Sequence, residues 1–200
     1  MAPRPDVSEE RKEQILEAAM EVFARSGFHG ARMDDIAKQA GLSKGALYWY
    51  FDGKDAIIQG IMDRMFAREF EQMGAFIDAD IPAKEKLVRY LELTLDDITN
   101  DEYLVPIMYE FWAMLLRKKR VKEVLGSYYK NFFDIAIPII QKGVDNGEFR
   151  KVNAEDVAIT IGAFIEGMFV LWAAIPDVVV LERHLRAGAN LIIESLSPHG

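Results

Sequence analysis

Apolar residues recur at every third or fourth position along most of the chain, and no stretch alternates apolar and polar residues as a half-buried strand does. Gly, Pro, Asn and Asp interrupt this spacing at intervals that suit about nine helices. We therefore predict an all-α fold. The expected helices cover about 8–27, 33–40, 44–50, 54–78, 82–100, 105–116 and 121–146, followed by an eighth that begins at Asn153 and a ninth from Asp177 to about Leu196.

Several local signals support these boundaries. Ser8 suits the N-cap of the first helix, Gly27 suits its end, and Pro138 should kink the seventh helix. The basic run 117–120 is expected to be a solvated loop before that helix. The first helix should bury one face, which carries Ile15, Leu16, Ala19, Val22 and Phe23.

Residues 33–51 meet the requirements of a helix-turn-helix, in which a short helix, a tight turn and a second helix are locked by apolar contacts. Ile36, Ala40 and Leu47 fall where packing is required, and Gly41 can adopt the positive φ of the turn. Ser43 is placed to cap the second helix. The alternative is an ordinary α-hairpin, in which the glycine only separates two helices.

Four consecutive aromatic residues, Tyr48 to Phe51, close the second helix of this motif. So short a helix cannot bury all four rings, and exposed rings favour a binding partner. Tyrosine hydroxyls can donate to phosphates, and a helix that enters the major groove reads bases from its first residues. The residues that we expect to contact DNA on this reasoning are Ser43, Lys44, Gly45, Ala46, Tyr48, Trp49, Tyr50 and Lys54.

The charge balance neither demands nor forbids DNA binding. The 200 residues carry a net charge of −8, whereas Arg32 to Lys54 hold four basic and three acidic side chains, a local balance of +1. Half of the residues are hydrophobic, 50%, which indicates a soluble globular chain with a substantial core. Charge alone would not locate the site.

Other classes of protein lack support in the sequence. There is no cysteine, and the three histidines, His29, His184 and His199, have no metal-ligand spacing. No catalytic triad, phosphate loop or cofactor fingerprint is readable, so we expect neither an enzyme nor a bound cofactor or metal. No signal peptide is evident, and we expect a cytoplasmic protein. A helical adaptor that binds protein without DNA affinity remains the alternative function.

The stretch 157–176 contains a single charge, Glu166, and is long enough to cross a membrane. It lacks basic anchors at its ends and contains Gly162 and Gly167, so we prefer a soluble helix that is covered by its own core and by a partner subunit. No membrane contact is expected. The last two helices carry small residues among large apolar ones, namely Gly162, Gly167, Ala187, Gly188 and Ala189 among Val170, Leu181, Leu185, Leu191 and Ile192.

Met and aromatic residues are dense after residue 60, and although most should be core, such a set also suits an apolar effector pocket. The expected pocket residues are Phe70, Tyr90, Trp112, Tyr128, Phe164 and Met168, with Glu110 and Glu166. The two carboxylates stand in apolar helices and would bind a lipophilic cation. Alternatively, each forms a salt bridge to a basic residue such as Arg89 or Lys130.

Taken together, these segments resemble the TetR/AcrR family of bacterial repressors. The resemblance covers about residues 8–58 and is carried by Gly27–Phe28 through Ile36–Ala37, Ala40–Gly45, Leu47–Tyr48, Tyr50–Phe51 and Lys54–Asp55. Weaker similarity follows at Glu110–Ala113, Gly143, Gly147–Arg150 and Ile165–Gly167. It implies an N-terminal helix-turn-helix DNA-binding domain, 1–53, and a larger helical ligand-binding and dimerisation domain, 54–200. It also implies a homodimer through the last two helices and a repressor that a small hydrophobic effector releases from a double-stranded DNA operator.

The sequence departs from the family at Arg32, where Thr or Ser usually caps the second helix, and at Gly53, where Ser or Asn is usual. Arg32 can still reach a phosphate, so we include it among the DNA-contacting residues. It cannot cap the helix in the same way. Asp34 or Asp35 in the first turn would then compensate, because acids stabilise the positive end of a helix.

Overall fold

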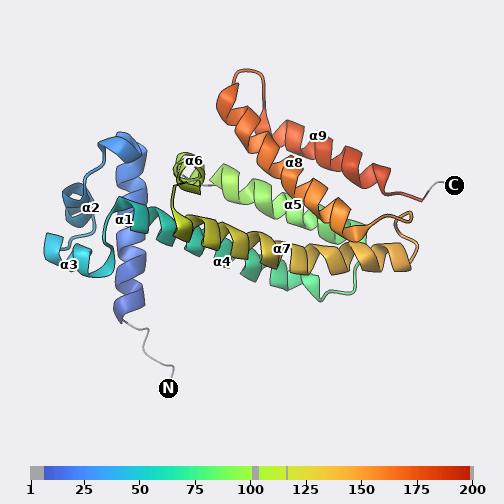
Figure 1. The fold of residues 1–200 in the computed structure, drawn as a ribbon, viewed down its shortest axis with the longest axis horizontal. Helices are drawn as coiled ribbons and strands as arrows, with labels where there is room; N and C mark the ends of the chain where they lie inside the picture. The colour runs from blue at the N-terminus through green and yellow to red at the C-terminus, as the bar shows by residue number, and fades with distance from the viewer. Residues whose placement is uncertain (1–6, 101–103, 116, 199–200) are drawn as a thin grey trace. The chain divides into compact units, whose positions relative to one another are not determined.

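The computed structural model describes residues 7–100, 104–115 and 117–198. Within these ranges the chain forms nine α-helices and no β-strand, which confirms the predicted all-α fold (Figure 1). The helices are α1 (Val7–Gly30), α2 (Met33–Gln39), α3 (Lys44–Tyr50), α4 (Lys54–Ile77), α5 (Ala83–Asn100), α6 (Leu104–Leu115), α7 (Lys119–Asp145), α8 (Ala154–Ala174) and α9 (Leu181–Ser195). Two compact units result, one of Met1–Arg68 with Ile98–Leu125 and the other of Glu69–Asp97 with Gly126–Gly200.

The first unit is organised around α1, which packs against α2 and α6, while α2 packs on α3. All five residues of the predicted apolar face of α1 are buried. Gly27 has φ 66° and ψ 163°, so the long helical segment is interrupted there, as predicted, although helical geometry resumes and extends to Gly30. Gln14 fixes α1 to the turn of the helix-turn-helix, because its Nε2 donates to the Ala40 carbonyl at 2.7 Å.

The second unit is built from the end of α4, from Glu69 onward, most of α5 and α7, and the whole of α8 and α9. In this unit α8 begins where the sequence predicts, after Asn153. The Asn153 side chain caps the helix, because it accepts hydrogen bonds from the N–H groups of Glu155 and Asp156 at 2.9 and 3.1 Å. The core of this unit includes Met73, Phe76, Leu87, Tyr90, Phe132, Ile140, Phe149, Ile165, Phe169 and Leu185.

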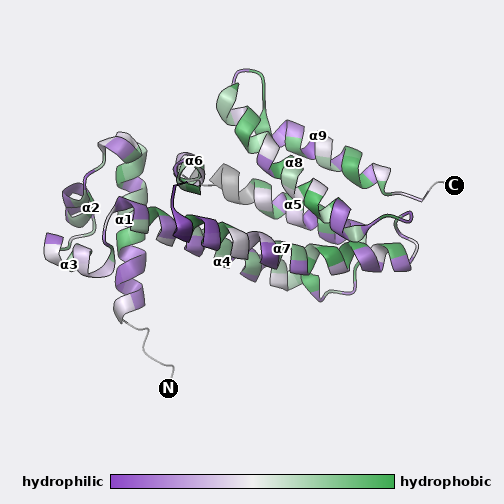
Figure 2. Cartoon of the chain, in the orientation of Figure 1, coloured by the Kyte–Doolittle hydropathy of each residue, from purple (hydrophilic) through white to green (hydrophobic). Residues whose placement is uncertain are grey.

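In the described part of the chain, α8 is the one helix that is long and apolar enough to cross a membrane, and its hydrophobic residues are visible in Figure 2. Only part of this apolar surface is buried: Ile159, Val170 and Leu171 are exposed by 46, 57 and 48%. The α8–α9 pair therefore presents an apolar face that the chain itself does not cover.

Three predicted boundaries are wrong. Ser8, the expected N-cap of the first helix, lies inside α1, which begins at Val7. The ninth helix begins at Leu181 and not at Asp177, and its N-terminal turn is closed by His184, whose Nδ1 accepts from the Val180 N–H at 3.0 Å. Residues 119 and 120 of the expected basic loop lie in the first turn of α7. The functional division between residues 53 and 54 stays a prediction.

Candidate DNA-binding surface and effector site

The turn between α2 and α3 fixes the direction of α3. Gly41 has φ 64°, a left-handed conformation that favours glycine, as predicted. The Ser43 Oγ then accepts the Ala46 N–H at 3.1 Å and caps α3, which confirms the predicted cap. Leu47 is completely buried and so are Ile36 and Ala37 of α2, so the angle between the two helices is set by apolar contact.

The exposed side chains of α3 form one face, which we call the α3 face: Lys44, Gly45, Tyr48 and Trp49. Positions 44 and 48, and 45 and 49, are four residues apart and lie above one another on a helix. Trp49 is exposed by 74% and Tyr48 by 43%, whereas the Trp49 and Tyr50 rings contact each other edge to face, with centroids 4.6 Å apart. The expectation that some of the four aromatics stay exposed is therefore confirmed.

Phe51 shows where the fourth aromatic lies. A Cβ added at Gly60 of α4 would come within 3.1 Å of the Phe51 ring and 3.0 Å of Leu16, so this ring packs between α1 and α4. The aromatic run thus divides into an exposed pair, the half-buried Tyr50 and one ring that anchors the motif. A large exposed indole on a well-anchored helix is a feature that protein packing does not explain.

Gly45 is unexplained by packing as well. A Cβ at this position would meet no atom within 4 Å, and the residue has no positive φ. Alanine would favour the helix by up to about 1 kcal/mol. The missing side chain is consistent with close approach of another molecule to the backbone at the start of α3.

Two charged residues of the motif, Lys44 and Asp34, form an ion pair. The Lys44 Nζ lies 2.7 Å from Asp34 Oδ1, and this carboxylate is the main cause that raises the pKa of Lys44. Arg32 stands at the N-cap of α2 in an extended conformation without a side-chain cap bond, as its residue type predicts. Asp34 and Asp35 occupy the first turn of α2, as expected, and their compensation for the missing cap stays a prediction.

Lys54, at the start of α4, is bound to the end of α1. Its Nζ donates to the carbonyl oxygens of Phe28 and, at 3.3 Å, His29, and it lies 4.6 Å from the centre of the Phe28 ring. The ammonium therefore stabilises the C-terminal end of α1, where positive charge is favourable. Whether it also holds a phosphate stays a prediction, as do the DNA contacts of the α3 face, Ser43, Ala46, Tyr50 and Arg32.

In the second unit, a buried carboxylate and tyrosines form a polar network. Glu69 of α4 is exposed by only 7%, and the Tyr128 hydroxyl of α7 donates to both of its oxygens at 3.2 and 3.1 Å. Burial raises the pKa of Tyr90, and the nearby charge of Glu69 raises it further. Burial likewise raises the pKa of Tyr128. These hydroxyls therefore remain protonated donors beside a carboxylate.

A second carboxylate is held in the same manner. The Tyr129 hydroxyl donates to Glu166 Oε1 of α8 at 2.6 Å. Burial raises the pKa of Glu166, and the hydrogen bond from Tyr129 opposes this shift only in part. Burial also raises the pKa of Tyr129. Because the Tyr128 and Tyr129 rings contact each other at 5.2 Å, both carboxylates belong to one cluster, which we call the Glu–Tyr cluster: Glu69, Tyr90, Tyr128, Tyr129 and Glu166.

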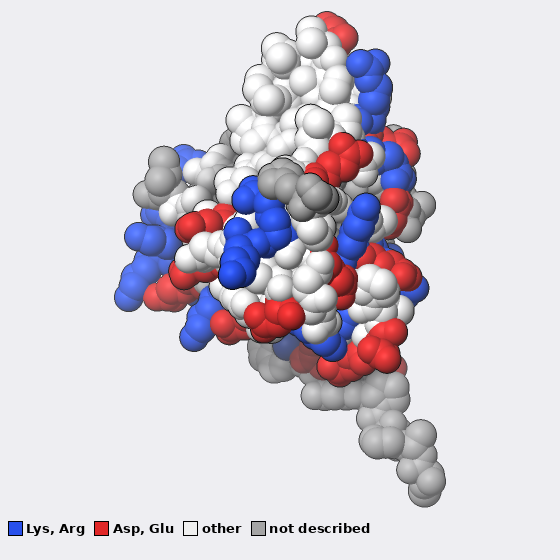
Figure 3. All heavy atoms as spheres, turned by 90° about the vertical axis from the view of Figure 1, so that its right-hand side faces the viewer, with Lys and Arg blue, Asp and Glu red and all other residues white. Residues whose placement is uncertain are grey.

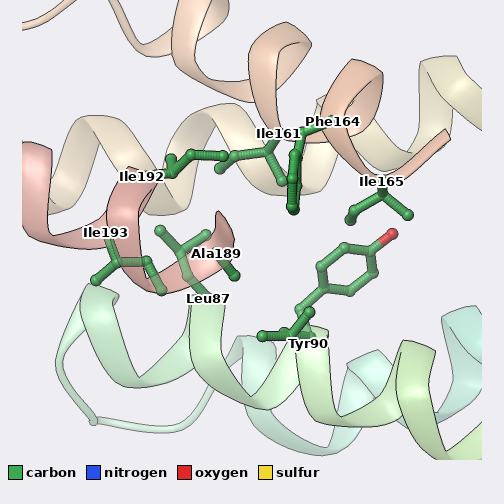
Figure 4. Close-up of a pocket in the computed structure, with 9 residues that line it drawn as sticks. Leu87, Tyr90, Ile161, Phe164, Ile165, Ala189, Ile192 and Ile193 are labelled. Atoms are coloured by element: carbon green, nitrogen blue, oxygen red, sulfur yellow. The ribbon is translucent and has the colours of Figure 1, made fainter. Parts of the chain in front are cut away.

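A small apolar cavity of about 30 Å³ lies beside Tyr90, between α5, α8 and α9 (Figure 4). Two of its walls, Tyr90 and Phe164, are residues that we expected in the pocket. The complete lining is Leu87, Tyr90, Leu91, Ile161, Phe164, Ile165, Ala189, Ile192 and Ile193. The cavity has room for about one water molecule, so a larger effector would have to displace side chains.

The other expected pocket residues lie in different places. The Phe70 ring contacts Tyr128 at 5.5 Å, beside the Glu–Tyr cluster, and Met168 is half-buried on α8 without lining the cavity. Trp112 and Glu110 belong to α6 in the first unit, where Trp112 contacts Tyr109 at 5.6 Å. The cavity beside Tyr90 is lined by two of the eight expected residues, Tyr90 and Phe164, and the ligand role of each of the eight stays a prediction.

The suggested partners of the glutamates were wrong. Glu166 is paired with Tyr129, and Glu110 lies 3.5 Å from His29, whereas Arg89 binds Glu85. Sequence reasoning also missed Glu69 and Tyr129. The sequence does contain a signal for the burial of Glu69. The buried face of α4 repeats every three, four or seven positions, at Met62, Phe66, Met73 and Phe76, and Glu69 lies on the same face.

Comparison with known proteins gives two family matches. Residues 15–61 match the bacterial regulatory proteins of the tetR family, and residues 83–195 match the C-terminal domain of BetI-type transcriptional repressors. Among similar curated proteins, the fatty acid metabolism regulator protein of Bacillus subtilis is 29% identical over 140 residues, which cover 69% of this chain and 70% of the relative. The HTH-type transcriptional regulator TtgR of Pseudomonas putida is 28% identical and covers 96 and 94% of the two chains.

Solved structures share the fold. A transcriptional regulator of Saccharomonospora viridis, in complex with choline, superposes with a TM-score of 0.83 at 24% identity and covers 96% of this chain and all of its own. FadR of Bacillus subtilis, in complex with stearoyl-CoA, gives 0.75 at 24% identity and covers 92 and 98%. The family matches span both the helix-turn-helix and most of the remaining chain, and the named relatives are regulators of transcription. The chain therefore belongs to the TetR family and is a DNA-binding transcriptional regulator.

Proposed function

We propose that this regulator is a repressor that reads its operator through the α3 face and leaves it when the second unit binds a small apolar effector with a cationic group. The observation that carries the first half is Gly45, a helix position without a side chain and without a packing reason for its absence. The observation that carries the second is the Glu–Tyr cluster, which buries two carboxylates with phenol hydroxyls as partners.

The DNA half can be tested at Gly45. Gly45→Gln places a helix-favouring, uncharged side chain into open space, so the variant should be at least as stable as the wild type. It should also bind operator DNA at least about tenfold more weakly, because the side chain occupies the position of the duplex backbone or base edges. Gly74→Gln in α4 is the matched control, since a Cβ there also meets nothing within 4 Å.

The assay is a gel shift with DNA from beside the gene, together with thermal unfolding of each variant. Unchanged affinity of Gly45→Gln would contradict the assignment of the α3 face. If no variant and no wild-type protein forms a discrete complex with any promoter fragment, the proposed mode of action is wrong as well.

The effector half rests on charge. The buried Glu166 carboxylate accepts a hydrogen bond from the neutral Tyr129 hydroxyl, and no ion pair of Glu166 is found among the described residues. A cation that enters the cluster would be attracted by this charge and by the faces of the tyrosine rings. The regulator from Saccharomonospora viridis, which shares the fold, is in complex with choline. We therefore expect alkyl ammonium compounds to act as effectors here, with the alkyl part displacing apolar side chains beside Tyr90.

Hexyltrimethylammonium is a suitable probe, with 1-hexanol as the neutral control. Addition of the cation should release DNA in the gel shift, whereas hexanol should not. Glu166→Gln keeps the shape and the acceptor for Tyr129 but removes the charge, so it should weaken the response to the cation and leave operator affinity alone. Equal responses of wild type and Glu166→Gln would remove the cationic effector from the proposal.

We further propose that the apolar face of α8 and α9 is covered by a second copy of the chain. Val170 and Leu191 are exposed by 57 and 69%, and the top of Figure 3, where Figure 1 places the α8–α9 connection, is nearly free of charged side chains. An interface between copies needs such a surface, and a twofold axis would place two α3 faces on one operator. Leu191→Glu should convert a dimer to a monomer in analytical ultracentrifugation, and a monomeric wild type would contradict the interface.

In this proposal α8 lies against protein and not lipid, and the regulator works in the cytoplasm without catalytic activity. Family membership supports each of these points, since the named relatives are regulators that act on DNA. A protein-binding adaptor without DNA affinity is not favoured by any of the named relatives.

A further inference from the structure

A second, larger hollow lies at the other end of the second unit from the α8–α9 connection. Its volume is about 360 Å³, compared with about 30 Å³ for the apolar cavity beside Tyr90, and it reaches the size range of small-molecule sites. We call it the α4–α7 cleft. It is lined by Ile77, Asp78, Ile81, Ala83, Lys86, Asp134, Ile135, Pro138, Ile139, Lys142 and Glu148.

Lys86 gives this cleft a buried positive charge. The side chain is exposed by only 6%, and its ammonium donates to the carbonyl of Ile77, which also lines the cleft. An ammonium has three donors, and a neutral carbonyl does not balance its charge. No ion pair of Lys86 is found among the residues that the structure describes. A buried cation in this state is complementary to a carboxylate.

Glu148 does not serve as that carboxylate. Its Oε2 accepts the backbone N–H of Ala83 at 2.6 Å, so it caps the N-terminal end of α5. An acid at this position is stabilised by the helix itself. Glu148 is therefore part of the wall and leaves the charge of Lys86 available to a ligand.

The rim of the cleft is acidic, in contrast to the positive charge of Lys86. Asp78 and Asp134 are exposed there with one base, Lys142, so acids are in excess at the rim. Figure 3 looks onto this end of the molecule and shows Lys or Arg and Asp or Glu side chains close together. The backbone carbonyl of Asp134 is a further acceptor. Four residues later in α7 stands Pro138, which has no N–H to donate to it.

From this order of groups we propose that the α4–α7 cleft binds a small zwitterion with an apolar side chain, of the α-amino-acid type. Its carboxylate would meet Lys86, its side chain would lie on the isoleucine walls, and its ammonium group would face Asp134 and Asp78. This site is distinct from the Glu–Tyr cluster, with which it shares no lining residue. It therefore adds a second ligand to the regulator and does not depend on the nature of the effector.

Isothermal titration calorimetry of the full chain with millimolar L-leucine tests the proposal. Leucine should bind once per chain. Two analogues isolate its charges: leucinamide lacks the carboxylate and 4-methylpentanoate lacks the ammonium, and each should bind at least about tenfold more weakly. Lys86→Met should cause a similar loss, whereas Lys84→Met, an exposed lysine half a turn away that does not line the cleft, should bind as the wild type does.

Ile139→Trp provides a second variant in case Lys86→Met does not fold, because a larger side chain on α7 would fill the cleft from its half-buried wall. Circular dichroism checks that each variant is folded. Absence of saturable leucine binding overturns the proposal, and so does equal binding by the wild type and the cleft variants. Loss of leucine binding in Glu166→Gln with retention in the cleft variants would assign the ligand to the Glu–Tyr cluster and would also overturn it.

Discussion

Packing between α8 and α9 depends on Gly188, and its replacement by alanine tests the described geometry directly. A Cβ at Gly188 would lie 2.2 Å from Cζ and 2.4 Å from Cε2 of Phe164, whereas ordinary contacts are 3.4–4 Å. The Phe164 ring must therefore move by about 1 Å or more. The neighbouring cavity of about 30 Å³ is too small to receive a displaced ring, so the two helices must separate or the ring must leave the core.

Two opposing effects set the magnitude. Alanine favours a helix over glycine by about 1 kcal/mol, while overpacking of a well-packed core costs about 1–3 kcal/mol. Since three ring atoms of Phe164 fall within 3.2 Å of the new Cβ, we take the upper end of that range. Gly188→Ala should then lose about 2 kcal/mol, which lowers Tm by roughly 4–8 °C in a chain of this length.

Thermal unfolding followed by circular dichroism measures this loss, at one protein concentration because Tm of an oligomer depends on it. Gly74→Ala is the control, since its Cβ meets nothing within 4 Å and it should raise Tm by about 2–4 °C. In the double variant with Phe164→Leu, the combined loss should be smaller than the sum of the two single losses. A Gly188→Ala protein as stable as the wild type, or strictly additive losses, would refute the reasoning.

Three further outcomes are expected. Ser43→Ala should remove the cap of α3 and lower the free energy of unfolding by about 1 kcal/mol, and an unchanged Tm would contradict the cap. Burial raises the pKa of Glu166, so the folded state holds this proton more tightly than the unfolded state does. The contribution of Glu166 to the free energy of unfolding therefore falls as pH rises from about 4.3, the usual pKa of glutamate, through the raised pKa. Glu166→Gln should therefore gain stability over the wild type with increasing pH in thermal unfolding, and a difference independent of pH would count against it. If each subunit of a dimer contacts about four phosphates, the log–log salt slope of operator binding should be roughly −7, and an interaction insensitive to salt would exclude phosphate contacts.

The helix-turn-helix could be predicted from sequence because short-range chemistry determines it. Gly41 supplies the positive φ, Ser43 caps the next helix, and the aromatic run is too dense for one short helix to bury. Each of these is decided by residues within a few positions of one another. The all-α fold followed in the same way from apolar spacing.

The start of α9 and the Glu–Tyr cluster could not be predicted with the same ease. Asp177 resembles a helix start, but it lies in a turn at residues 176–178, and the helix begins only at Leu181, where His184 accepts the Val180 N–H. Glutamate is rarely buried, so the apolar stripe of α4 does not by itself predict a buried Glu69, and its hydrogen-bond partner Tyr128 is 59 positions away. Long-range partners of this kind are not contained in local spacing.

The Glu–Tyr cluster is a costly arrangement for a protein that only needs to fold, and this cost is an argument for its function. Glutamine at position 166 could accept the same hydrogen bond from Tyr129 without burying a charge. The retained carboxylate makes the site complementary to a cation before that cation arrives, so binding need not supply the desolvation of the anion. The small size of the cavity beside Tyr90 means that an effector must favour a different arrangement of these side chains. A ligand shifts such an equilibrium only by its difference in affinity between the two arrangements. A cation gains this difference through its attraction to the charge of Glu166, and a neutral analogue does not.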